Sequence, residues 1–282
     1  MTRIDAHQHF WHPARADYPW MPVDDPILAK PYHPDDLNAH LRETGISQTV
    51  LVQAAPTMAE TDYLLGIADA SSTVGKVVGW INFEDPTQIE VLERFARHPK
   101  FSGVRPMIQD LPDDDWMLQK NVQWAYKAII DMDLTFDCLG FPRHLDNFYR
   151  LLTRYPNMRA VIDHCMKPQL RNHSEEEFAF WAEGLSHLAN ETGVFCKLSG
   201  LVTEADTDWS ATALKPYIDH VLSAFGAHRI MWGSDWPVSR LRCEYNDWFQ
   251  CAQTLTAHLE QAQREMIFGQ TAIQFYRIEL PR

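Results

Sequence analysis

Three side chains that could bind a metal ion or activate a water molecule lie near opposite ends of this 282-residue sequence. His7 and His9 stand two residues apart in an apolar stretch, and Asp235 follows another such stretch. Alternate side chains of a strand share one face, so two imidazoles at this spacing can bind one ion. A carboxylate at the end of a buried strand must be paired, protonated or bound to a metal. With 13 histidines in the chain, a chance pair that is only hydrogen-bonded is the alternative.

A fold that brings the two ends together is therefore required, and the pattern of elements predicts one. Eight apolar strand-like runs alternate with helical segments, at residues 3–9, 48–53, 76–81, 101–105, 134–138, 158–164, 194–199 and 229–237. This alternation predicts an α/β protein with a parallel sheet buried on both faces. Eight units in this length match a (β/α)8 TIM barrel, which we expect to form a single domain over residues 1–282. A doubly wound open sheet is the alternative, but its Gly-x-Gly-x-x-Gly turn is not present.

Polar residues gather where these predicted strands end, which is where barrel enzymes place their active sites. They are His7, His9, Gln53, Arg105, Asp137, His164, Lys197 and Asp235. His164 would face the mouth as a catalytic residue or further metal ligand, or else be a satisfied core histidine. Arg105 requires an anionic partner if buried: a substrate oxygen, or a salt bridge to Asp137 or an acidic loop. Lys197 could point inward or outward.

A long loop over residues 11–33 follows the first predicted strand and is expected to lie over the barrel mouth. Its aromatic residues, Trp20 among them, either stack on a substrate or simply cover the mouth. Trp236 is a second candidate for stacking on a sugar. For Trp80, core packing is the favoured interpretation.

Composition limits the classes of function. The net charge of -13 argues against nucleic-acid binding and against docking on an anionic membrane, and no apolar stretch is long enough to span a bilayer. We expect a cytoplasmic protein, because no signal peptide precedes the first strand and the five cysteines include no Cys-x-x-Cys pair. Cys165 should point away from His164, so the two cannot form a catalytic pair, whereas Cys138 remains a candidate nucleophile. The Gly-x-Ser-x-Gly elbow of a serine hydrolase does not occur. The oligomeric state is left open, a homo-oligomer included.

With these residues in place, the chain resembles the amidohydrolase superfamily, in its amidohydrolase-related (amidohydrolase 2) branch, over nearly its whole length. Within that branch it is most similar to sugar lactonases of the L-fuconolactonase and L-rhamnonolactonase type. The segments that carry the resemblance are residues 5–11, Asp163-His164 with Lys167-Pro168, residues 197–200, 232–237 and 268–272, and Tyr18-Pro19-Trp20 in the first loop.

The resemblance implies a barrel that hydrolyses a small sugar lactone with water activated at Asp235. It implies that His7, His9, His164 and Asp235 could hold a divalent metal, zinc or else manganese. Many relatives bridge two metals through a lysine or glutamate on strand four, where this chain has Arg105. We therefore expect one metal at most, and it could be dispensable because some relatives in this branch work without any.

In the expected mechanism, Asp235 acts as base while Arg105 and His164 assist, and Gln53, Arg105, Trp20 and Trp236 bind the substrate. Three alternatives remain: hydrolysis of a muconolactone or pyrone dicarboxylate, a metal-dependent decarboxylation, or a non-catalytic barrel that binds a sugar acid.

Overall fold

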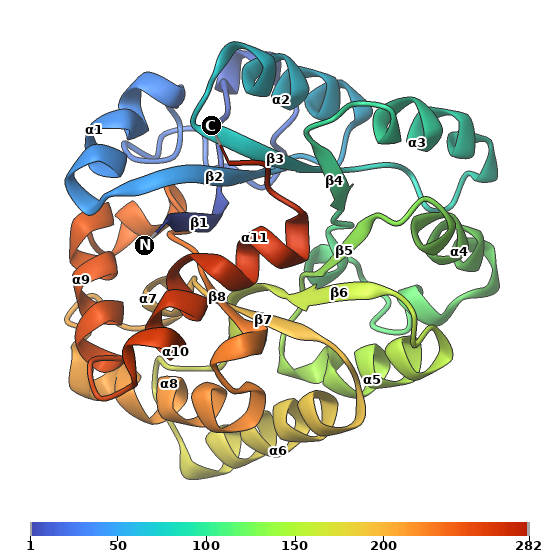
Figure 1. Cartoon of the computed structure of the whole chain (residues 1–282). Coiled ribbons are helices and arrows are strands. Elements are labelled where there is room, and N and C mark those ends of the chain that lie inside the picture. The colour runs from blue at the N-terminus through green and yellow to red at the C-terminus, as the bar shows by residue number, and fades with distance from the viewer. Residues whose placement is uncertain (1, 281–282) are drawn as a thin grey trace.

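Eight parallel strands form a nearly closed barrel in the computed structural model of this chain, which describes residues 2–280 (Figure 1). Neighbours in the sheet follow the order of the sequence, from β1 to β8. The strands are β1 (Arg3–Gln8), β2 (Ile46–Val52), β3 (Val74–Gly79), β4 (Phe101–Val104), β5 (Thr135–Cys138), β6 (Arg159–Ile162), β7 (Phe195–Leu198) and β8 (Ile230–Trp232). The predicted (β/α)8 barrel is confirmed.

Helices surround the strands on the outside of the barrel, and the last helix crosses one end of it (Figure 1). The helices are α1 (Pro34–Thr44), α2 (Met58–Ala70), α3 (Ile89–Ala96), α4 (Gln123–Asp131), α5 (Leu145–Arg154), α6 (Glu175–Glu191), α7 (Leu201–Glu204), α8 (Ala211–Phe225), α9 (Tyr245–Leu255), α10 (Gln261–Glu265) and α11 (Thr271–Tyr276). Phe275 and Tyr276 of α11 pack with inward side chains of the strands, such as Ile4 and Val50, and so close this end of the barrel. Over residues 2–280, no helix is long and apolar enough to cross a membrane.

The seam between β1 and β8 closes through a few backbone hydrogen bonds beyond the end of β8. The amide of Asp235 donates to the carbonyl of His7 at 2.8 Å, and the amide of His9 donates to the carbonyl of Trp236 at 2.7 Å. The buried carboxylate of Asp5 accepts hydrogen bonds from the Ser234 amide at 2.9 Å and the Tyr245 hydroxyl at 3.0 Å. These contacts bring the two ends of the sequence together.

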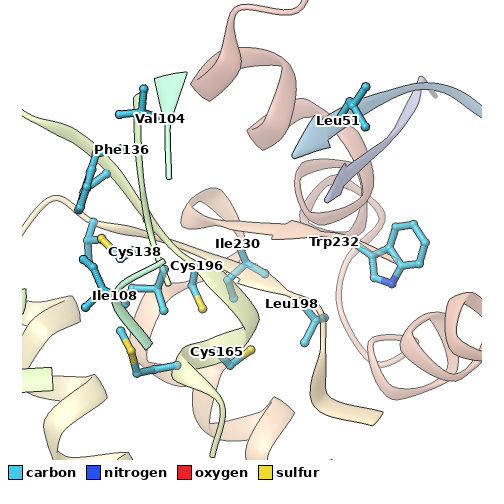
Figure 2. Packing of buried hydrophobic residues seen from close by; sticks show 14 of the residues in the cluster. Leu51, Val104, Ile108, Phe136, Cys138, Cys165, Cys196, Leu198, Ile230 and Trp232 are labelled. Atoms are coloured by element: carbon cyan, nitrogen blue, oxygen red, sulfur yellow. The ribbon is translucent and has the colours of Figure 1, made fainter. Parts of the chain in front are cut away.

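Three cysteines lie in the apolar packing around the barrel, where a thiol behaves as a small hydrophobic group. Figure 2 shows Cys138, Cys165 and Cys196 beside apolar side chains such as Phe136 and Ile230. Burial raises the pKa of the Cys138 and Cys196 thiols well above the usual value. The Cys165 thiol donates to the carbonyl of Lys197 at 3.3 Å, away from any histidine. A cysteine nucleophile is therefore not supported.

The sixth strand ends earlier than predicted, at Ile162 instead of His164. Four consecutive residues then have positive φ, from His164 at 54° to Lys167 at 47°. Such a left-handed run is unfavourable for residues with a Cβ atom, at roughly 1–2 kcal/mol each, so a pattern of apolar residues gives no warning of it. The turn places the side chains of His164 and Lys167 at the barrel mouth.

Candidate active site

The structure brings the two strand-one histidines and the strand-eight aspartate together at the carboxyl ends of the strands. His7 Nε2 and His9 Nε2 are 3.2 Å apart. The Asp235 Oδ1 atom lies 3.4 Å from His9 Nε2 and 3.8 Å from both His7 Nε2 and His164 Nε2. All four side chains are buried. One carboxylate oxygen therefore faces three imidazoles.

Close approach of the backbones at the seam makes this cluster compact. A Cβ atom at Gly233 would lie 2.7 Å from the Cβ of His7, which is too close for any other residue without a shift. Asp235 itself has a φ of 56°, a left-handed conformation that aspartate tolerates better than most residues. The turn after β8 thus aims the carboxylate back across the mouth toward β1.

His164 is held by the end of β7 and the residues that follow it. Its Nδ1 atom lies 2.9 Å from the hydroxyl of Ser199. Gly200, with a φ of 66°, packs so closely that a Cβ atom there would lie 2.5 Å from His164 Nδ1. The ring is therefore fixed with its Nε2 atom toward Asp235.

Arg105 is buried beside the histidines, and its charge partner is Asp163. Its Nη1 atom lies 3.3 Å from Asp163 Oδ2 and 3.3 Å from His7 Nε2. Its Nη2 atom donates to the carbonyl of Gln53, while its Nε atom is buried with no hydrogen-bond partner in the described chain. The suggested salt bridge to Asp137 is wrong, because Asp137 pairs with another cation.

That cation is Lys197, which points inward and lies beneath the histidines. Its ammonium group is 2.5 Å from Asp137 Oδ2, 2.9 Å from Asp163 Oδ1 and 3.0 Å from His7 Nδ1. The direction of Lys197 could not be predicted from the sequence, and Asp163 was not among the predicted site residues. The available signal was the position of Asp163 directly before His164 at the end of a strand.

Electrostatics keep the central carboxylate charged. Burial alone would raise the pKa of Asp235, but His164, His9 and His7 outweigh this effect and hold the pKa well below its usual value. Burial lowers the pKa of His164 to about 4 and also lowers the pKa of His9 and His7. At neutral pH the site is thus an ionised carboxylate among neutral imidazoles, so Asp235 is in the unprotonated form that a general base requires.

A cavity of about 210 Å³ opens onto this cluster. Its lining includes His9, Arg105, His164 and Asp235, the apolar side chains of Trp20, Met107 and Leu139, and the charged groups of Asp110, Lys167 and Glu204. Charged and apolar surfaces together suit a small polar ligand with one apolar side.

Two of the predicted substrate-binding residues do not line this cavity. Gln53 is fully buried, and its amide donates to the carbonyl of Arg105 at 2.6 Å, so it supports Arg105 instead. Trp236 is also buried and packs against Tyr32 and Phe10. Both predictions of substrate contact are corrected: neither side chain reaches the cavity surface.

The aromatic residues of the first loop fall into two groups, one that covers the barrel mouth and one that lines the cavity. Trp11 and Tyr18 are buried and cover the barrel mouth. Trp20 lines the cavity, where its indole N–H donates to the carbonyl of Ala54 at 2.6 Å. Trp80 is only partly buried and lines a separate cavity beside the first, so core packing is not its whole role.

The histidines and aspartate also fit a divalent metal ion. Ligand atoms of His7, His9 and Asp235 all lie within 4.8 Å of one another, and His7, Asp163 and His164 form a second such group. His9 Nδ1 lies 2.7 Å from the carbonyl of Val52 and must carry the proton, which leaves the lone pair on Nε2 facing Asp235. His164 falls in the second group, so the four predicted ligands divide between two overlapping groups.

Known proteins match this chain in sequence and in structure over nearly their whole length. The sequence profile of an amidohydrolase family matches residues 4–278. L-fucono-1,5-lactonases of Burkholderia ambifaria and Burkholderia multivorans are 42% and 34% identical, and each match covers 99% of this chain and 97% of the relative. A crystal structure of a Burkholderia multivorans amidohydrolase with bound zinc has a TM-score of 0.94 and 33% identity, covering 99% of this chain and all of that one.

Proposed function

The chain belongs to the amidohydrolase family, and on this premise we propose that it hydrolyses a sugar lactone of the L-fuconolactone type to the aldonic acid. Two lactonases that match nearly end to end support the reaction class. The single observation that carries the proposal is the ionised Asp235 carboxylate at the cavity surface, surrounded by three imidazoles.

Asp235 is the base in the proposed mechanism. It takes a proton from a water molecule as the water oxygen attacks the lactone carbonyl carbon. The carbonyl oxygen gains negative charge, and the bond from carbon to the ring oxygen then breaks. Protonated Asp235 returns the proton to the ring oxygen, which becomes the hydroxyl of the product. Neutral His9 and His164 beside the carboxylate orient the water and the substrate.

Arg105 stabilises the developing oxyanion. Its guanidinium is buried at the cavity wall, and its Nε–H group lacks a partner in the described chain. A fixed cation at the cavity wall attracts a substrate oxygen as that oxygen gains negative charge. Fixed donors of this kind are typically worth about 3 kcal/mol of transition-state stabilisation.

We further propose that His7, His9 and Asp235 hold one divalent metal, with zinc as the first choice and manganese as the second. The zinc-bound relative and the donor set support this assignment. When bound, such an ion lowers the pKa of water from about 15.7 toward about 7. The roles of Asp235 and Arg105 stated above do not depend on it.

Charge in the cavity disfavours the alternative substrates. Three carboxylates line it, from Asp110, Glu204 and Asp235, against the two cations Arg105 and Lys167. These protein groups offer no excess of basic residues to bind a dicarboxylate or an aromatic acid, whereas a neutral lactone needs none. The same argument disfavours a barrel that only binds a sugar acid.

A cytoplasmic location and a homo-oligomeric state stay predictions. The five cysteines are all free thiols, which is consistent with a cytoplasmic location.

A panel of lactones tests the proposal. Purified protein is assayed for acid release from L-fucono-, L-rhamnono- and L-galactono-lactones, with a pyrone dicarboxylate for comparison, and its metal content is measured before and after chelation. We expect turnover of at least one sugar lactone and none of the dicarboxylate. Turnover of the dicarboxylate alone would contradict the proposal.

A further inference from the structure

Two oppositely charged side chains face each other at the cavity without forming a direct hydrogen bond. The ammonium group of Lys167 and the Oε1 atom of Glu204 are 3.8 Å apart, and the side chains are only 17% and 21% exposed. A direct bond between an ammonium and a carboxylate normally measures about 2.7–2.9 Å. The observed gap is longer than such a bond, although both groups line the cavity.

The backbone holds both residues in place. Lys167 ends the left-handed turn that begins at His164, and its amide donates to the His164 carbonyl at 2.8 Å. Glu204 is the last residue of α7, and its carbonyl accepts from the amide of Arg171 at 3.2 Å. One turn therefore presents a histidine to Asp235 and a lysine to Glu204. The charged pair is fixed relative to the catalytic carboxylate.

Stability of the fold does not explain this pair. Ion pairs that remain partly hydrated and lack direct hydrogen bonds contribute about 0–1 kcal/mol. Burial raises the pKa of Glu204, and the nearby Asp235 charge adds to this effect while Lys167, Arg171 and Arg242 oppose it. The protein thus keeps a partly buried carboxylate with unused acceptor capacity at its ligand cavity.

We propose that Lys167 and Glu204 form a binding subsite for two neighbouring hydroxyl groups of the sugar lactone, which rests on the proposed function. Each sugar hydroxyl both donates and accepts. One hydroxyl accepts from the Lys167 ammonium and its neighbour donates to the Glu204 carboxylate. The pair then selects lactones by the position of a vicinal diol, while Asp235 and Arg105 act on the carbonyl.

Deoxygenated lactones combined with two variants test the subsite. The variants are Glu204→Ala and Lys167→Met, which keeps the length of the side chain but removes its charge. Glu244→Ala is the control, because Glu244 forms an exposed ion pair with Arg240 outside the cavity lining. Each protein is assayed on the parent lactone and on analogues that lack one ring hydroxyl.

For the wild type, we expect removal of a recognised hydroxyl to lower kcat/KM by about 10- to 100-fold, the range for hydrogen bonds to charged groups. Glu204→Ala should lower kcat/KM on the parent lactone by a similar factor. On the analogue that lacks the hydroxyl bound by Glu204, the variant should show no further loss of kcat/KM. Lys167→Met should behave in the same way toward the neighbouring hydroxyl. The control should match the wild type within about twofold on every substrate.

The inference is overturned if the wild type hydrolyses every deoxygenated lactone as well as the parent, or if each variant loses the same factor on all substrates. If the wild type hydrolyses no lactone, the proposed function fails separately. Calorimetric titration with the free pyranose sugar and its deoxy analogues then tests the subsite without turnover. Equal affinity for sugar and analogues overturns it, and weaker binding of the analogues, lost in Glu204→Ala, supports it.

Discussion

Lys197 is the residue on which the arrangement of side chains beneath Asp235 depends. Its ammonium group contacts Asp137, Asp163 and His7, and all four side chains are fully buried. Asp163 in turn contacts Arg105. Burial alone would raise the pKa of Asp163, but Lys197, His7 and Arg105 hold it well below the usual value. The site thus stands on a buried network in which each charge has an opposite partner.

Removal of this lysine should therefore destabilise the fold severely. In Lys197→Met, the carboxylates of Asp137 and Asp163 lose a partner in the interior, and we expect the free energy of unfolding to fall by about 3–5 kcal/mol. Chemical denaturation measures this change. Lys215→Met, which breaks an exposed pair with Asp219, should change stability by less than about 0.5 kcal/mol. Equal stability of the two variants would show that the network is not needed for folding.

Sequence alone identified the residues of the site better than their roles. His7, His9 and Asp235 could be grouped because the strand period and the closure of a barrel determine which residues meet. Gln53 and Trp236 were assigned to the substrate because they lie at or near strand ends. Whether such a side chain reaches the cavity depends on neighbouring bulky groups, such as Tyr32 against Trp236, and no local pattern encodes that.

At the scale of elements, the left-handed turn after β6 supplies two residues of the cavity lining. It carries His164 and Lys167 on one short segment, and Gly200 after β7 packs against the His164 ring. Residues in this conformation persist only where the surroundings hold them, and they often occur at functional sites. The predicted sixth strand extended to His164, the first residue of this turn, because the sequence up to that point is equally compatible with an extended chain.

Gly200→Ala tests this contact. The new Cβ would lie 2.5 Å from His164 Nδ1 and would sit at a φ of 66°, so the ring must move. We expect a loss of about 1–2 kcal/mol in stability from the backbone alone and a fall in kcat. Gly66→Ala in α2 is the matched control, because nothing lies within 4 Å of its Cβ, and it should gain about 0.5–1 kcal/mol. Unchanged kcat in Gly200→Ala would argue against a role for the His164 position.

At the scale of the whole molecule, function depends on closing the barrel between its first and last strands. In the described chain few hydrogen bonds cross this seam, and the buried carboxylate of Asp5 accepts one of them from Ser234 and a further bond from Tyr245 of α9. The order of strands and the barrel class could be predicted, because eight repeated apolar runs leave few alternatives. The exact closure of the barrel could not be predicted, because it depends on the close packing at Gly233 and on the buried acid Asp5, which lies far from Gly233 in the sequence.

Asp5→Ala should open this seam. The amides of His7 and Ser234 and the hydroxyl of Tyr245 would lose their acceptor, at about 1–3 kcal/mol for each buried group left unpaired. Thermal or chemical unfolding would show the loss. Asp5→Asn retains one oxygen acceptor and should be clearly more stable than Asp5→Ala. If both variants are as stable as the wild type, Asp5 does not hold the seam.

Turnover by Asp235→Asn tests the central claim most directly. Asparagine keeps the size of the side chain but cannot take a proton from water. On the lactone that the wild type hydrolyses best, we predict a fall in kcat of about 10²- to 10⁴-fold, with an unfolding midpoint close to that of the wild type. A variant that keeps kcat within tenfold of the wild type would contradict the account, because the proton would then be taken by another group.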